Sequence, residues 1–395
     1  MKGSKSTLFM LAACLSLTLA PLAGCTEKPE DPDLEKPNPE KPDPDDDDPA
    51  YTIKGYKTLK EAFAGKFTMG ASLQPEQYGG KGPIDPISTA LCKKHFNSVV
   101  AGNCMKMISV QRTEGNWTFS EADRFVQFGE ANKMEIIGHC LVWHNQVGDW
   151  MFKNADGSRV SREKLIERLE THITTVVKRY KGKVKGWDVV NEAFDEGGGY
   201  RQSPFFQIIG KEYLEIAFKA AHKADPDVEL YYNDYNMWYE GKRKAVVNLV
   251  NEFKAKGIRI DAIGMQSHVK FNKHDPSIKG FEESIKAFAA TGLNVMITEL
   301  DMTMFSYGDN SNPYVSGLPA DKAKEWSDRM LEFFGLFVKY EKNITRVTTW
   351  GIYDAISWMN NQPVKGRTDY PLLFDRQGKP KTVVSNILGG ILDDK

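Results

Sequence analysis

The chain lacks the patterns that mark several classes of protein. Its 395 residues include five cysteines, and none forms a Cys-x-x-Cys pair or a Cys/His cluster, so there is no zinc-site pattern. We expect neither a metal nor an organic cofactor. The net charge is only −1, and no lysine and arginine run is interleaved with aromatic residues, which argues against nucleic acid as a partner. Cys92, Cys104 and Cys140 are expected to be small buried residues, with one disulfide among them as the alternative.

The amino terminus has the pattern of a bacterial lipoprotein signal. Two lysines precede an apolar stretch, Leu8–Leu22, that is short for a membrane span and runs into Leu22-Ala23-Gly24-Cys25. Residues 1–24 are therefore predicted to be a signal peptide, and Cys25 is predicted to carry lipid that tethers the protein to a membrane. An uncleaved anchor is the alternative. Thr26 resembles the residue that directs lipoproteins to the outer membrane of Gram-negative bacteria, with the cell surface and the periplasmic face both open.

Residues 25–50 form an acidic linker that is rich in proline and aspartate. From Glu27 to Pro49 the chain has almost no apolar residue, so it cannot bury a core. Prolines favour an extended chain, and the acidic run Asp45–Asp48 repels itself, which predicts a stiff stalk. An acidic tail that binds metal or protein is the alternative.

Residues 51–395 are expected to form one α/β domain, a (β/α)8 TIM barrel. Short β-rich runs alternate with amphipathic stretches, which implies a parallel sheet, and eight such units imply that the sheet closes. Ser120–Asp123 has the spacing of a helix capping box. The expected strands are Phe67–Leu73, Phe96–Gly102, Glu135–Trp143, Val184–Glu192, Glu229–Asp234, Asp261–His268, Asn294–Asp301 and Thr345–Tyr353. The expected helices include Arg162–Tyr180, Pro204–Ala224, Lys242–Lys256, Ile278–Thr291 and Asp321–Tyr340.

Two of the predicted strands end at a carboxylate. Trp187–Glu192 and Ile297–Asp301 are apolar runs that stop at an acidic residue, and a buried carboxylate is costly unless it has a partner or a chemical task. The working face of such a barrel lies at the carboxyl ends of its strands. Other polar and aromatic residues collect at the same predicted ends, which favours a functional interpretation of the set: Asn103, Lys106, His139, Trp143, Gln146, Asn191, Asn233, Tyr235, Gln266, His268 and Trp350.

These motifs resemble those of the family-10 glycoside hydrolases, the endo-β-1,4-xylanases. His139–Gln146 is similar to the family's HxLVWHxQ strand, and Trp187–Glu192 to its WDVVNE motif. Gly264–His268, Ile297–Asp301 and Trp350–Trp358 resemble the later strands and the loop that follows them. The resemblance runs from about Thr68 to near Leu392, with the motifs in the family's order.

The resemblance implies a retaining double displacement, in which two carboxyl groups lie about 5–5.5 Å apart across the glycosidic bond. Glu192 would be the acid/base and Glu299 the nucleophile. His268 would donate to Glu299, and Asp301 would orient that imidazole. Asn191 would bond the sugar 2-hydroxyl, and Gln266 would lie beside the catalytic pair. The implied substrate-binding residues are Asn103, Lys106, His139, Trp143, Gln146, Tyr235, Trp350 and Trp358.

Two positions depart from the family's pattern after the second strand. Gly102 stands where the family usually has a glutamate that holds a distal sugar, and Met107 where it commonly has tryptophan. These changes concern the grip on the polysaccharide, not bond cleavage. We therefore expect hydrolysis of xylan by a monomer, with another β-glycan as an alternative substrate. A surface lipoprotein that binds glycan without cutting it is the second alternative, and the retention of two mutually repelling carboxylates argues against it.

Overall fold

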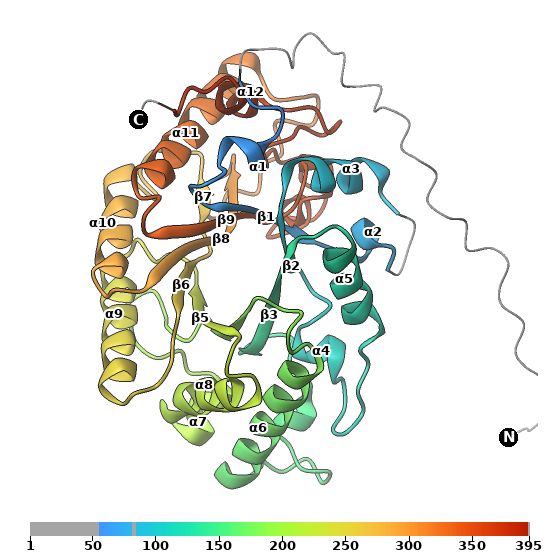
Figure 1. The fold of residues 1–395 in the computed structure, drawn as a ribbon, viewed down its shortest axis with the longest axis vertical. Coiled ribbons are helices and arrows are strands. Elements are labelled where there is room, and N and C mark those ends of the chain that lie inside the picture. The colour runs from blue at the N-terminus through green and yellow to red at the C-terminus, as the bar shows by residue number, and fades with distance from the viewer. Residues whose placement is uncertain (1–54, 81–83, 394–395) are drawn as a thin grey trace, which may run out of the picture. The chain divides into compact units, whose positions relative to one another are not determined.

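The computed structural model describes residues 55–80 and 84–393 (Figure 1). The predicted signal peptide, the lipidation site Cys25 and the whole of the predicted stalk lie outside the described residues. Within the described ranges, no helix is both long enough and apolar enough to cross a membrane. The cysteines at positions 92, 104 and 140 are buried and free, so the alternative of a disulfide among them is not realised.

The described chain folds into the predicted closed barrel of parallel strands, enclosed by helices (Figure 1). The order β6-β5-β4-β3-β2-β1-β9-β8 is closed by a pairing between β6 and β8, and all these pairs are parallel. The predicted sixth strand is divided into β6 and β7 at Gln266 and Ser267. The strands are β1 (Thr68–Leu73), β2 (Ser98–Ala101), β3 (Glu135–Trp143), β4 (Gly186–Asn191), β5 (Glu229–Asp234), β6 (Ala262–Met265), β7 (His268–Lys270), β8 (Asn294–Thr303) and β9 (Ile344–Thr349).

Helices of very different lengths connect the strands. Four of the five helices predicted above match a single observed helix to within one or two residues at each end. The α-helices are α1 (Leu59–Ala62), α2 (Pro75–Tyr78), α3 (Pro86–His95), α4 (Met107–Val110), α5 (Ser120–Ala131), α6 (Arg162–Arg179), α7 (Pro204–Ile209), α8 (Glu212–Ala224), α9 (Glu240–Ala255), α10 (Ile278–Ala289), α11 (Ala320–Lys339) and α12 (Thr382–Leu388). Short 3-10 turns are η3 (Asp149–Met151), η4 (Asp354–Ile356) and η5 (Trp358–Asn360).

Two local predictions are wrong. The single helix expected over Pro204–Ala224 is broken into α7 and α8. Gly210 between them has a φ of 86°, which lies outside the range of a right-handed α-helix. The capping box expected at Ser120 is not formed. Phe119 already has near-helical angles (φ −98°, ψ −6°), so the helix begins at Ser120 itself and its N-cap has no side-chain hydrogen bond.

The core has two parts because side chains alternate between the faces of each strand. One face packs against the surrounding helices and forms the main apolar core. The opposite face forms a small separate cluster in the barrel interior, and Trp350, directly after β9, packs against it. This filled interior supports the residues at the strand ends from below. The interior cluster consists of Val100, Ile137, Tyr231, Ala262 and Met296.

Candidate active site

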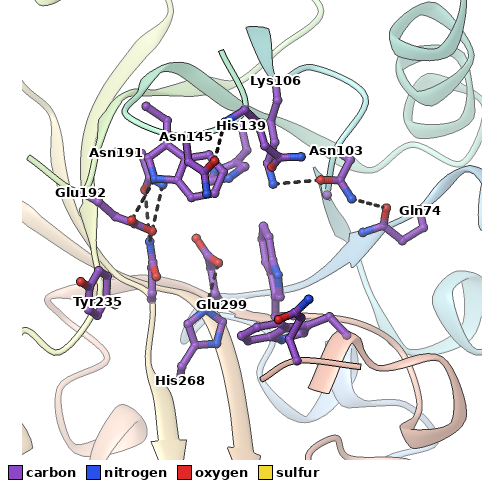
Figure 2. A pocket seen from close by; sticks show the side chains of 17 residues that line it. Gln74, Asn103, Lys106, His139, Asn145, Asn191, Glu192, Tyr235, His268 and Glu299 are labelled. Carbon is purple, nitrogen blue, oxygen red and sulfur yellow. Dashed lines mark hydrogen bonds and ion pairs between the residues drawn. The ribbon is translucent and has the colours of Figure 1, made fainter. Parts of the chain in front are cut away.

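A cleft of about 870 Å³ lies at the carboxyl ends of the strands. Every side chain predicted for catalysis or substrate binding lines it, except Asp301, which is fully buried behind His268. Figure 2 shows these side chains converging from different strands. The cleft is lined by Gln74, Gly102, Asn103, Lys106, His139, Trp143, Asn145, Gln146, Asn191, Glu192, Tyr235, Gln266, His268, Glu299, Trp350, Trp358 and Gln362.

Glu192 follows the last residue of β4 and leaves the strand direction. Its φ is 59°, an uncommon value for a residue other than glycine, and its backbone N–H still donates to the Asn233 carbonyl at 2.9 Å. The turn points the carboxylate into the cleft, where its side chain remains 12% exposed. Trp143 Nε1 donates to Oε2 at 2.8 Å, and Gln266 Nε2 donates to Oε1 at 3.0 Å. Glu192 is therefore fixed in direction while still open to a ligand.

Glu299 lies within β8, and its side chain is more deeply buried than that of Glu192, at 6% exposed. Asn233 Nδ2 donates to its Oε1 at 2.9 Å, and His268 Nε2 lies 3.2 Å from its Oε2. Burial alone would raise the pKa of Glu299, but the His268 hydrogen bond and the charge of the nearby histidines outweigh burial and lower it. The geometry therefore keeps this carboxylate ionised, as a nucleophile requires.

His268 links Glu299 to the buried Asp301. Its Nδ1 lies 2.8 Å from Asp301 Oδ1, and Trp358 Nε1 donates to the other Asp301 oxygen at 2.9 Å. Burial would lower the pKa of His268, but the charges of Asp301 and Glu299 and their hydrogen bonds raise it to about 10. His268 is therefore an imidazolium at neutral pH and donates from both ring nitrogens.

Three amide side chains connect the two glutamates. Asn191 Oδ1 accepts from Asn233 Nδ2 at 3.0 Å and from Gln266 Nε2 at 3.2 Å, while each donor also bonds one glutamate. Asn233 is itself oriented by Thr298, whose hydroxyl donates to Asn233 Oδ1 at 2.6 Å. The sequence placed Asn233 at a strand end without a role. Asn233 lies at the end of β5, between the strands that carry the predicted site residues Asn191 and Gln266 at their ends. This position was the signal in the sequence that could have identified it.

One wall of the cleft carries the predicted binding residues of the second and third strands. Lys106 Nζ donates to Asn103 Oδ1 at 2.9 Å and lies 4.8 Å from the centre of the Trp143 ring. His139 is held by Asp188, with 2.8 Å between Nδ1 and Oδ2. Gln74 completes this wall and was not predicted, because nothing in the β1 sequence marks it.

Aromatic side chains and a polar rim complete the cleft. Trp350 meets the ring of His139 edge-on at a centroid distance of 5.3 Å, and Trp358 is 42% exposed above His268. Tyr235 accepts a hydrogen bond from Arg201 through its hydroxyl at 2.7 Å. Gln146 is exposed at the rim. Met107, by contrast, begins α4 as a buried core residue and does not line the cleft.

The site offers carboxylates, amides and aromatic faces but no metal centre. Among the described residues, no group of three or more histidine, cysteine, aspartate or glutamate side chains is arranged to hold a metal ion. Two carboxyl groups in different environments, beside tryptophans and amide side chains, define a barrel glycosidase.

Comparison with known proteins identifies the family. The model described as Glycosyl hydrolase family 10 matches residues 58–389, and the chain belongs to that family. It is 47% identical over 346 residues to "Endo-1,4-beta-xylanase A" of Xylanibacter ruminicola, which covers 84% of this chain and 92% of that protein.

Solved structures agree with this assignment. A family-10 endoxylanase retrieved from a sugarcane soil metagenome superposes with a TM-score of 0.80 at 37% identity, over 85% of this chain and 100% of the other. The intracellular xylanase of Thermoanaerobacterium saccharolyticum, solved as a mutant in complex with xylotriose, gives a TM-score of 0.75 at 38% identity, over 83% and 97% of the two chains.

Proposed function

We propose that this protein is an endo-1,4-β-xylanase that cleaves xylan with retention of configuration at the anomeric carbon. The observation that carries the proposal is the pairing of Glu192 and Glu299 in one cleft with different surroundings. Glu299 is buried and beside an imidazolium, whereas Glu192 is partly exposed and bonded by uncharged donors. Two carboxyl groups held in unlike environments can perform unlike tasks in one reaction.

In the first step, Glu299 attacks the anomeric carbon of the bound sugar, and Glu192 gives its proton to the glycosidic oxygen. The bond to the departing chain breaks, and a glycosyl ester forms on Glu299. In the second step, Glu192 takes a proton from water, which attacks the same carbon and releases Glu299. The His268 imidazolium stabilises Glu299 whenever that group is a carboxylate, at the start and the end of the cycle.

The neighbouring side chains are proposed to bind the sugars. Asn191 is proposed to bond the 2-hydroxyl of the sugar that reacts, because its amide donates to Glu192 and accepts from Asn233, which also donates to Glu299. Trp143, Trp350 and Trp358 offer flat apolar faces for pyranose rings. The residues proposed to bind hydroxyl groups are Asn103, Lys106, His139 and Gln146, with Tyr235 proposed to stack a sugar on the leaving side.

The experiment that tests this function is product analysis with purified protein. We expect new reducing ends and short oligosaccharides from linear xylan, none from cellulose or barley glucan, and first-formed products with the β-anomer in NMR spectra. Glu299→Ala should lower kcat by more than about 10⁴-fold while xylo-oligosaccharide binding stays measurable by calorimetry. Equal activity on glucans, or α-anomers as first products, would contradict the proposal.

We further propose that the protein is a lipoprotein anchored to an outer membrane through Cys25, with residues 1–24 removed, residues 25–50 as a stalk and residues 51–395 as the catalytic domain. The lipobox pattern and the apolar stretch before it support this proposal. Palmitate labelling followed by detergent partition tests it. A Cys25→Ala protein that still sediments with membranes would contradict it.

A further inference from the structure

The side chain of Gln74 fills the space beside Gly102. A Cβ atom at position 102 would collide with Nε2 of Gln74 and would lie 2.9 Å from the backbone oxygen of Leu73. Gly102 does not have a positive φ, so its backbone conformation does not require glycine. A larger residue at position 102 would therefore displace the Gln74 amide and press on the Leu73 backbone oxygen, so glycine is what allows Gln74 its present position.

Gln74 is held firmly at the edge of the cleft. It follows β1 as the N-cap residue of α2, and its backbone N–H donates to the side-chain oxygen of the buried Gln77. Asn103 Nδ2 donates to Gln74 Oε1 at 2.9 Å, and Lys106 donates to Asn103 at 2.9 Å. Figure 2 shows these three side chains in a row. The row orients the Gln74 amide without help from a ligand.

One end of this row has unused hydrogen-bonding capacity. Among the residues that the structure describes, the amide nitrogen of Gln74 has no hydrogen-bond acceptor, although Gln74 lines the cleft. No carboxylate of the described chain forms an ion pair with Lys106, which is only 7% exposed. This wall therefore presents amide donors and a buried cation to the ligand, and sugar hydroxyl oxygens are suitable acceptors for them.

We propose that Gln74 is a substrate-binding residue that donates from Nε2 to a hydroxyl of a sugar on the glycone side, beyond the sugar that reacts. The order of contacts supports this position: Glu192 touches Trp143, Trp143 touches Lys106, and Asn103 lies between Lys106 and Gln74. Gln74 is thus the member of the series farthest from the acid. This inference rests on the proposed xylanase function and specifies one of its binding residues.

Substrate length provides the first test. For Gln74→Ala we expect kcat/KM to fall about 3- to 10-fold on xylotetraose and on an aryl β-xylobioside, because one uncharged hydrogen bond is lost. On an aryl β-xyloside with one sugar, kcat/KM should stay unchanged. Gln207→Ala, an exposed glutamine on α7 outside the cleft, is the matched control and should change neither. Wild-type values on every substrate, or an equal loss on the single-sugar substrate, would overturn the proposal.

A double-mutant cycle provides the second test. Gly102→Ala should displace the Gln74 amide and cause a similar loss on xylotetraose, and its loss should be smaller in the Gln74→Ala background, where only the contact with the Leu73 oxygen remains. Fully additive losses would contradict the inference that residues 74 and 102 compete for one space. Thermal unfolding of each variant checks that it is folded. If the wild-type protein does not hydrolyse xylan, the proposed function is wrong, and that result does not test the role of Gln74. Calorimetry with xylotetraose then still decides this inference, since Gln74→Ala must bind about 3- to 10-fold more weakly.

Discussion

His268 and Asp301 lie opposite each other on the parallel strands β7 and β8, and their side chains form a hydrogen bond of 2.8 Å. The pairing register of two strands therefore orients the imidazole and leaves its other nitrogen 3.2 Å from Glu299. Because His268 carries charge, the register places a fixed cation beside the proposed nucleophile.

Removing this cation should move the acidic limb of the pH profile. His268 lowers the pKa of Glu299, so Glu299 stays ionised to lower pH in the wild-type protein. In His268→Gln we expect the acidic limb of kcat/KM to shift to higher pH by about one unit or more. Rates on an aryl β-xylobioside between pH 3 and 8 measure the shift. His222→Gln, an exposed histidine on α8, should leave the limb in place.

The same histidine should make stability depend on pH in the alkaline range. Its folded-state pKa of about 10 lies above its ordinary value of 6.5, so its stabilising contribution is complete below about pH 6.5 and is lost as pH rises through about 10. The difference in unfolding free energy between the wild type and His268→Gln should therefore shrink from pH 6 to pH 10. Urea titrations at several pH values test this. A constant difference would mean that His268 is not charged in the folded protein.

Loss of the acid should depend on the leaving group. In Glu192→Ala, hydrolysis of xylan needs protonation of a poor leaving group and should slow by about 10²- to 10⁴-fold. An aryl β-xylobioside whose phenol leaves readily should be affected far less at the first step. Kinetics over a series of phenols of different acidity give the dependence. The acid role is refuted by an equal loss across that series.

Asn233 should matter although it does not line the cleft. Its Nδ2 donates to both Glu299 and Asn191, so Asn233→Ala leaves Glu299 Oε1 without its donor and Asn191 Oδ1 with Gln266 as its remaining donor. We expect kcat/KM to fall about 10- to 100-fold. Asn251→Ala on the outer helix α9 is the matched control. An unchanged rate in Asn233→Ala would show that the amide network does not position the glutamates.

The barrel could be predicted because its signals are local. Buried parallel strands give continuous apolar runs, and amphipathic helices of normal length separate them. Strand ends were less certain: Glu192 was assigned to its strand, but its φ of 59° places it in the turn that follows. That turn depends on Asn233 of the next strand, a contact that a single run of sequence does not contain.

The candidate site was predicted mainly where polar residues end a strand. Their positions relative to the predicted strand ends were enough to predict that the two glutamates, His268 and the tryptophans lie in one cleft. Gln74 was missed because the room for its side chain is left by Gly102, which follows a different strand. The break at Gly210 was missed for a similar reason, since glycine is also tolerated within helices and only its φ shows the interruption.

Trp143 has consequences for how future kinetic data are interpreted. Its ring faces Lys106 while its indole N–H donates to Glu192, so one side chain contacts both a proposed sugar-binding residue and the proposed acid/base. Replacing it with phenylalanine would keep an aromatic surface but free the carboxyl group to rotate. Michaelis constants and turnover numbers should therefore change together for any replacement here, and stacking strength cannot be extracted from this position alone.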